Sequence, residues 1–207
     1  MAVRLKTRWH KSRRSERNRR GSNAPKQLKD LASVIGINIW KMAKEVFLHM
    51  EKQGYRFGED QQSVNVLSEF VIYQVHIVDR LLYGVVDDSE RNEFVNVTAN
   101  YLMETVVENQ IDLMGPGEYE QLFLQRMNSR FDEYSECSFE NEQPGYALTR
   151  TLAMHVAEEM KVTDDKWVIE QVIDIEAPSI IEKIVAVANE VLGLRQRKNS
   201  GSENRKE

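Results

Sequence analysis

The chain lacks several residue types and motifs that define common classes of protein. Its 207 residues include one cysteine, Cys137, so no disulfide can form within the chain. This fits a reducing compartment, and we expect a cytoplasmic location. No apolar run reaches the roughly 18–20 residues that a membrane-spanning helix needs. A glycine-rich phosphate loop and the Gly-x-Ser-x-Gly, His-Glu-x-x-His and Cys-x-x-Cys motifs are also missing, which removes the usual sequence signs of several enzyme classes.

Residues that interrupt helices are scarce, with four prolines and ten glycines. Apolar residues recur at intervals of three and four, and no stretch alternates at period two over more than a few residues. The sequence therefore predicts an all-α protein, a single bundle of six or seven helices. Helices are expected over residues 27–53, 60–83, 87–114, 118–134, 145–160, 163–175 and 177–193, with an acidic loop at 135–144.

Charge is distributed unevenly along the chain. Residues 1–27 carry ten lysines and arginines and one glutamate, a net charge of +9, whereas the remainder carries 18 basic and 32 acidic residues, a net charge of −14. We expect a disordered basic arm at 1–27, a helical bundle at 28–193 and a polar tail at 194–207.

The basic arm is expected to contact nucleic acid or an anionic membrane surface. The arginines that would do so are Arg13, Arg14, Arg17, Arg19 and Arg20. A tail that is merely solvated, or an organellar transit peptide, would have a similar composition.

The stretch from Val64 to Tyr83 is apolar on nearly every side, which is typical of a buried central helix. It nevertheless contains Glu69, His76, Asp79 and Arg80. Buried ionisable groups must be paired, hydrogen-bonded or bound to metal. At 100° per residue, Glu69 and His76 lie nearly in line, about 10.5 Å apart along the helix axis.

Two further helices carry polar groups at one-turn spacing: the helix over 87–114 has two carboxylates and an amide, and the helix over 145–160 has a histidine and a carboxylate. Together they suggest a dinuclear metal site inside the bundle, for which oxygen and imidazole ligands favour iron or manganese. The candidate ligands are Glu69, His76, Asp79, Glu104, Glu108, His155 and Glu158. A glutamate with a histidine seven residues later, completed from two other helices, resembles the ligand plan of diiron oxidases built on a haem-oxygenase-like bundle. The Glu-x-x-His pair of ferritin-like proteins is missing.

The same residues have two other interpretations. The charged groups could form buried ion pairs around a core histidine that is hydrogen-bonded. They could also line a metal-free polar pocket for a small ligand, formed by Tyr73, Arg80, Asn100 and Arg150. The apolar stripe of the helix over 177–193 could be core or a seam between two copies of the chain, so a homo-oligomer is a further possibility.

Two functions from different classes follow from these patterns. The first is a non-enzymatic binding or interaction module whose basic arm contacts an anionic partner. The alternative is a metal-dependent, oxidase-like helical bundle. His10 and His49 are interpreted as exposed or incidental, and no substrate is indicated.

Overall fold

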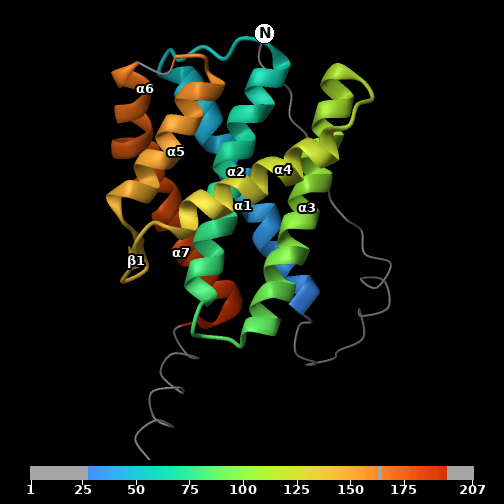
Figure 1. Ribbon diagram of the computed structural model, residues 1–207, viewed down its shortest axis with the longest axis vertical. Coiled ribbons are helices and arrows are strands. Elements are labelled where there is room, and N and C mark those ends of the chain that lie inside the picture. The colour runs from blue at the N-terminus through green and yellow to red at the C-terminus, as the bar shows by residue number, and fades with distance from the viewer. Residues whose placement is uncertain (1–27, 163–164, 195–207) are drawn as a thin grey trace, which may run out of the picture.

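The computed structural model describes residues 28–162 and 165–194, and it confirms the predicted all-α bundle (Figure 1). The helices are α1 (Leu28–Lys52), α2 (Asp60–Leu82), α3 (Asp88–Met114), α4 (Tyr119–Ser135), α5 (Tyr146–Glu159), α6 (Lys166–Gln171) and α7 (Ala177–Leu192), with a π-helical segment, η1, at Val172–Glu176. The predicted disordered arm at 1–27 and the tail from 195 onward lie outside the described residues. No helix of the described part is both long and apolar enough to cross a membrane.

Helix ends follow the expected turn chemistry. The Asp87 side chain caps α3 by accepting a hydrogen bond from the backbone N–H of Glu90 at 2.9 Å. Glycines with positive φ follow α1, α2 and α3, at 97° for Gly54, 71° for Gly84 and 85° for Gly115. Because side chains disfavour this backbone region, glycine ends these helices without strain.

The expected break near Ala177 is absent, because α6, η1 and α7 form one continuous helical run. Pro178 lies in the first turn of α7. Proline has no N–H to donate and its ring crowds the carbonyl one turn earlier. The wider π turn directly before it accommodates both effects without ending the helix.

A two-stranded antiparallel hairpin stands where an acidic loop was expected. Its strands are β1 (Phe139–Glu140) and β2 (Gln143–Pro144). The two turn residues, Asn141 and Glu142, have φ of 53° and 61°, as a tight hairpin turn requires. A pair of two-residue strands gives no alternating pattern in the sequence, so this feature could not be predicted.

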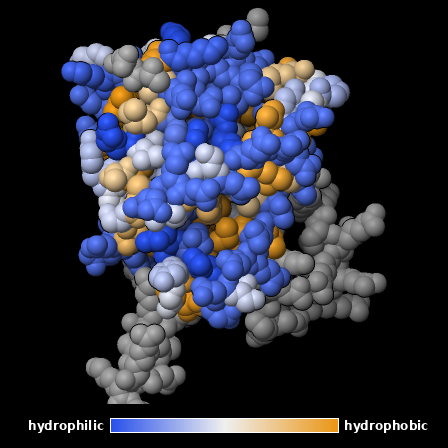
Figure 2. Space-filling view, in the orientation of Figure 1, coloured by the Kyte–Doolittle hydropathy of each residue, from blue (hydrophilic) through white to orange (hydrophobic). Residues whose placement is uncertain are grey.

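Helix α2 occupies the centre of the bundle, as its apolar sequence predicts, and it contacts α1, α3, α4, α5 and α7. Five residues of the apolar stripe of α7, Ile180, Ile181, Ile184, Ala188 and Leu192, are buried in the core, and Val185, Val187 and Val191 are partly buried against it. Leu194, assigned by sequence to the tail, is also fully buried. Helix α4 crosses in front of α2 and α3 (Figure 1). The outer surface of the molecule on this side is largely hydrophilic (Figure 2).

Candidate functional site

The predicted polar face of α2 lies underneath α4. Glu69, Tyr73 and His76 follow one another along this face, and all three are at least 97 % buried. Glu69 contacts arginines of α4. The rings of Tyr73 and His76 lie 5.9 and 5.4 Å from the ring of Tyr134, also on α4. The helical spacing thus placed Glu69, Tyr73 and His76 on one side of α2, and α4 is the helix that covers this side.

Glu69 is completely buried and binds two arginines one turn apart on α4. Arg130 donates from Nε to Oε2 at 2.9 Å and from Nη2 to Oε1 at 3.1 Å, a two-pronged contact. Arg126 donates from Nη1 to Oε1 at 3.2 Å. Burial alone would lower the pKa of Arg130, but the hydrogen bond and the charge of Glu69 raise it above its ordinary value, so Arg130 stays charged.

The second guanidinium nitrogen of Arg126 reaches α5. It forms an ion pair with Oε1 of Glu159 at 2.9 Å, and Asn65 donates to Oε2 of the same carboxylate at 2.7 Å. Gln61 donates in turn to Asn65 at 2.7 Å. This branch joins α2, α4 and α5 through one arginine.

Arg130 starts a second branch toward α5, donating to Glu133 at 3.2 Å. Glu133 lies 2.6 Å from Nε2 of His155, and Nδ1 of His155 lies 3.4 Å from Glu158. Burial raises the pKa of Glu133, but the contacts with His155 and Arg130 outweigh that effect and lower it. We call the two branches together the Glu69 network; its members are Gln61, Asn65, Glu69, Arg126, Arg130, Glu133, His155, Glu158 and Glu159.

The Glu69 network contains three of the seven predicted metal ligands, namely Glu69, His155 and Glu158. The predicted contact between His155 and Glu158 is confirmed. The positive charge beside Glu69 comes from Arg126 and Arg130, which already occupy both of its oxygens. In the part of the chain that the structure describes, no group of three or more histidines, cysteines or acidic residues could hold a metal ion.

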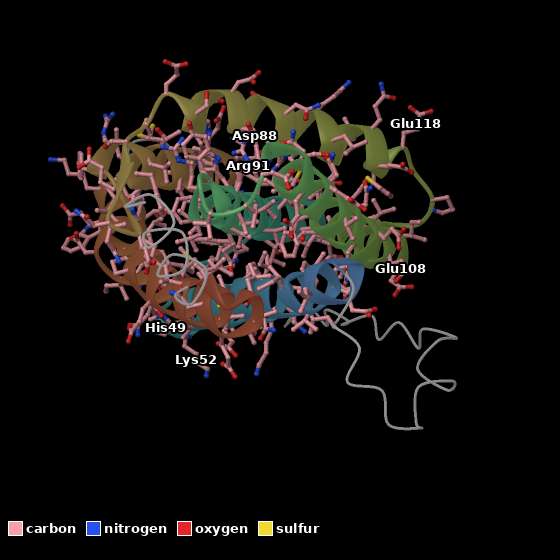
Figure 3. The ribbon with its side chains drawn as sticks, turned by 90° about the horizontal axis from the view of Figure 1, so that it is seen from below. His49, Lys52, Asp88, Arg91, Glu108 and Glu118 are labelled. Carbon is pink, nitrogen blue, oxygen red and sulfur yellow. The ribbon has the colours of Figure 1, made fainter. Side chains whose placement is uncertain are left out.

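The other predicted ligands lie elsewhere. Asp79 accepts hydrogen bonds from Arg91 at 3.1 and 3.2 Å. Glu104 and Glu108 are exposed on α3. Figure 3 shows Arg91 beside Asp88 at the start of α3, and Glu108 toward the other end of that helix. His76 has no hydrogen-bond partner on either ring nitrogen among the described residues.

The four residues predicted to form a polar pocket differ in their exposure. Tyr73 is buried, whereas Asn100 and Arg150 are exposed. The guanidinium of Arg80 lies 5.9 Å from the ring centres of both Tyr83 and Phe139. None of the four lines the cleft described below.

Next to the Glu69 network, the buried rings of Tyr73 and His76 pack against the buried ring of Tyr134. Burial lowers the pKa of His76 to about 4, with a smaller contribution from Arg80. Burial also raises the pKa of Tyr73 to about 12, and its hydroxyl faces Thr149 without hydrogen-bond geometry. The pKa of Tyr134 is raised well above its ordinary value, again through burial. All three are therefore uncharged at neutral pH, and this part of the core holds polar atoms without charge.

A cleft of about 460 Å³ opens beside the Glu69 network. It is lined by Gln61, Asn65, Ser68, Gln110, Leu122, Phe123, Gln125, Arg126, Ser129, Arg130 and Glu159. These residues belong to α2, α3, α4 and α5. The arginines and glutamines of this lining were not predicted from the sequence as site residues. One sequence signal could have placed the arginines on the inward side of their helix. Arg126 and Arg130 are four residues apart, and Met127 lies next to Arg126 on the buried side.

A second buried carboxylate, Glu176, lies in the π segment and is 2 % exposed. It contacts Nδ1 of His49 at 2.7 Å and accepts a hydrogen bond from Gln171 at 2.7 Å. Gln53 lies 3.3 Å from the other ring nitrogen of His49. His49, interpreted from sequence as incidental, is thus a partner of a buried charge at the edge of the bundle (Figure 3).

Replacing His49 with alanine is expected to lower the free energy of unfolding by about 1–2 kcal/mol, because Glu176 loses one of its two partners while staying buried. Urea unfolding followed by circular dichroism measures the change. The control is Lys183→Ala, which breaks the exposed ion pair with Glu45. That variant is expected to lie within about 0.5 kcal/mol of the natural chain, and equal effects of the two substitutions would contradict the role given to His49.

The arrangement combines a network of paired charges with an adjoining polar cleft, and this suits binding. Hydrogen-bond donors and acceptors converge there from four helices. No protein-family model, curated protein or solved structure significantly matches the chain.

Proposed function

We propose that this protein is a binding module that contacts nucleic acid through residues 1–27. The separation of charge along the chain carries the proposal. Residues 1–27 hold ten basic residues and one acidic residue, whereas residues 28–194 hold 13 basic and 30 acidic residues. A polyanion is attracted by the first segment and repelled by the second, so the basic segment is the part suited to contact it.

The composition of the basic segment favours phosphate over a lipid surface. Seven of its ten basic residues are arginines, whose planar guanidinium binds phosphate with two parallel hydrogen bonds. Trp9 adds one ring that can stack on a base. Apart from Trp9, the large apolar side chains of the segment are Met1, Val3 and Leu5, too few for an apolar face that would enter a membrane.

The folded body offers a stable attachment for such a segment. Helix α1 begins at Leu28, and the buried core begins at Ala32. Substitutions within residues 1–27 therefore replace no residue of the described core, and their effect on binding can be separated from an effect on folding.

Replacing Arg13, Arg14, Arg17, Arg19 and Arg20 with glutamine is expected to weaken binding to a labelled DNA or RNA oligonucleotide. Each phosphate contact contributes about 0.7–0.9 to the slope of log affinity against log salt. The five substitutions are therefore expected to reduce that slope by about 3–5. Fluorescence anisotropy over a series of salt concentrations measures both quantities.

The matched control removes the same charge from exposed positions of the body. Its five substitutions, also to glutamine, are at Lys41, Lys52, Arg56, Arg150 and Lys166. We expect this variant to bind somewhat more weakly at low salt, because the body becomes more acidic, but to keep the salt slope of the natural chain, because it loses no proposed phosphate contact. Equal salt slopes for both variants would contradict the proposal, and so would binding to anionic vesicles but not to either oligonucleotide.

A further inference from the structure

The cleft beside the Glu69 network is a second place where this chain can recognise its partner. We infer that the cleft between α2, α3 and α4 binds an unpaired nucleobase. The choice of ligand class rests on the proposed contact with nucleic acid, but the site itself rests on residues of the folded body. Three properties of the cleft lead to the inference.

The first property is a lining rich in side-chain amides. Gln61, Asn65, Gln110 and Gln125 reach the cleft from α2, α3 and α4. An amide presents one donor group and one acceptor group side by side, the pattern found along the edges of nucleobases. Unpaired bases are commonly recognised through hydrogen bonds to these edges.

The second property is charge balance. Arg126 and Arg130 line the cleft, but Glu69 and Glu159 neutralise them through direct hydrogen bonds and ion pairs. A cleft whose two arginines are already paired with carboxylates favours a neutral ligand over a phosphate group. The guanidinium planes, with Arg126 at 19 % and Arg130 at 13 % exposure, can still stack on a flat ring.

The third property is an acceptor without a partner. Gln110 lines the cleft and is 5 % exposed, and its Oε1 has no hydrogen-bond partner among the described residues. An unpaired buried acceptor is unfavourable unless a donor reaches it. An N–H group on the edge of a base is such a donor.

The size and the mixed polarity of the cleft agree with this ligand. Its volume of about 460 Å³ lies within the roughly 300–1,000 Å³ of small-molecule sites. Leu122, 58 % exposed, and Phe123 add apolar surface to one side. A base needs both an apolar face for its ring and polar groups for its edge.

The test uses free uridine, cytidine, adenosine and guanosine as probes on the full chain, with backbone amide chemical shifts as the readout. At least one nucleoside is expected to shift the signals of Ser68, Gln110 and Arg130 in a saturable way. Gln110→Leu is expected to weaken that binding at least tenfold. Leucine removes the unpaired acceptor, so the fold is expected to be retained, and a thermal melt checks this.

The control is Gln74→Leu. Gln74 is a second glutamine whose buried Oε1 has no hydrogen-bond partner within residues 28–162 and 165–194, but it lies in the core and does not line the cleft. We expect nucleoside affinity within twofold of the natural chain in this variant. A weakening of binding by Gln74→Leu as large as that by Gln110→Leu would overturn the assignment, and so would equal shifts with ribose alone.

The two proposals fail separately. The absence of saturable shifts with all four nucleosides would overturn the cleft as a nucleobase site. An oligonucleotide that still bound through the five arginines would then leave the proposed function standing. Conversely, nucleoside binding in a chain whose five arginine substitutions have no effect on oligonucleotide binding would support the cleft alone.

Discussion

Replacing Glu69 with alanine is expected to lower the free energy of unfolding by about 3–5 kcal/mol, the usual consequence of removing one partner of a buried ion pair. Glu69 is fully buried and accepts hydrogen bonds from Arg126 and Arg130. Without it, two guanidinium groups that are mostly buried lose the carboxylate between them. Urea unfolding followed by circular dichroism measures the loss.

The matched control is Glu108→Ala on α3. Both glutamates were predicted from sequence as metal ligands, but Glu108 is exposed. We expect the control to change stability by no more than about 0.5 kcal/mol. A loss of less than about 1 kcal/mol on replacing Glu69 would mean that its contacts with α4 do not hold the helix in place.

Lowering the pH from 6.5 to 4 is expected to destabilise the protein through His76 by about 3 kcal/mol. The folded chain lowers the pKa of His76 from 6.5 to about 4, mainly because the ring is buried. Above pH 6.5 the ring is neutral in both states, so pH has no effect through it. Between pH 6.5 and 4 the unfolded chain binds a proton that the folded chain does not, which favours unfolding.

His76→Leu isolates this contribution from that of the carboxylates. At pH 7.5 the variant is expected to lie within about 1 kcal/mol of the natural chain, because neither nitrogen of His76 has a hydrogen-bond partner in the described part of the chain. At pH 4.5 we expect the variant to be more stable than the natural chain by about 2–3 kcal/mol. A stability difference that stayed constant between the two pH values would show that His76 is not held neutral by burial.

The sequence predicted what depends on spacing within a single helix. The shared face of Glu69, Tyr73 and His76 follows from 3.6 residues per turn, and the structure confirms it. The contact between His155 and Glu158, three residues apart on α5, has the same origin. The central position of α2 follows from its apolar content.

What the sequence could not give is the partner of each charge. Arg126 and Arg130 lie more than fifty residues from Glu69 in the chain, and only the path of α4 across α2 brings them together. A buried carboxylate is suited to a metal ion and to an arginine alike, because both supply positive charge. The pattern on α2 therefore predicted a need for positive charge without identifying its source.

A double-mutant cycle between Glu69 and Arg130 tests most directly whether α4 supplies that charge. The cycle compares Glu69→Gln, Arg130→Met and the double variant in urea unfolding. We expect a coupling free energy of about 2 kcal/mol or more, since the two side chains share a two-pronged, largely buried contact. Additive effects, with a coupling near zero, would contradict the account and favour another source of positive charge at Glu69.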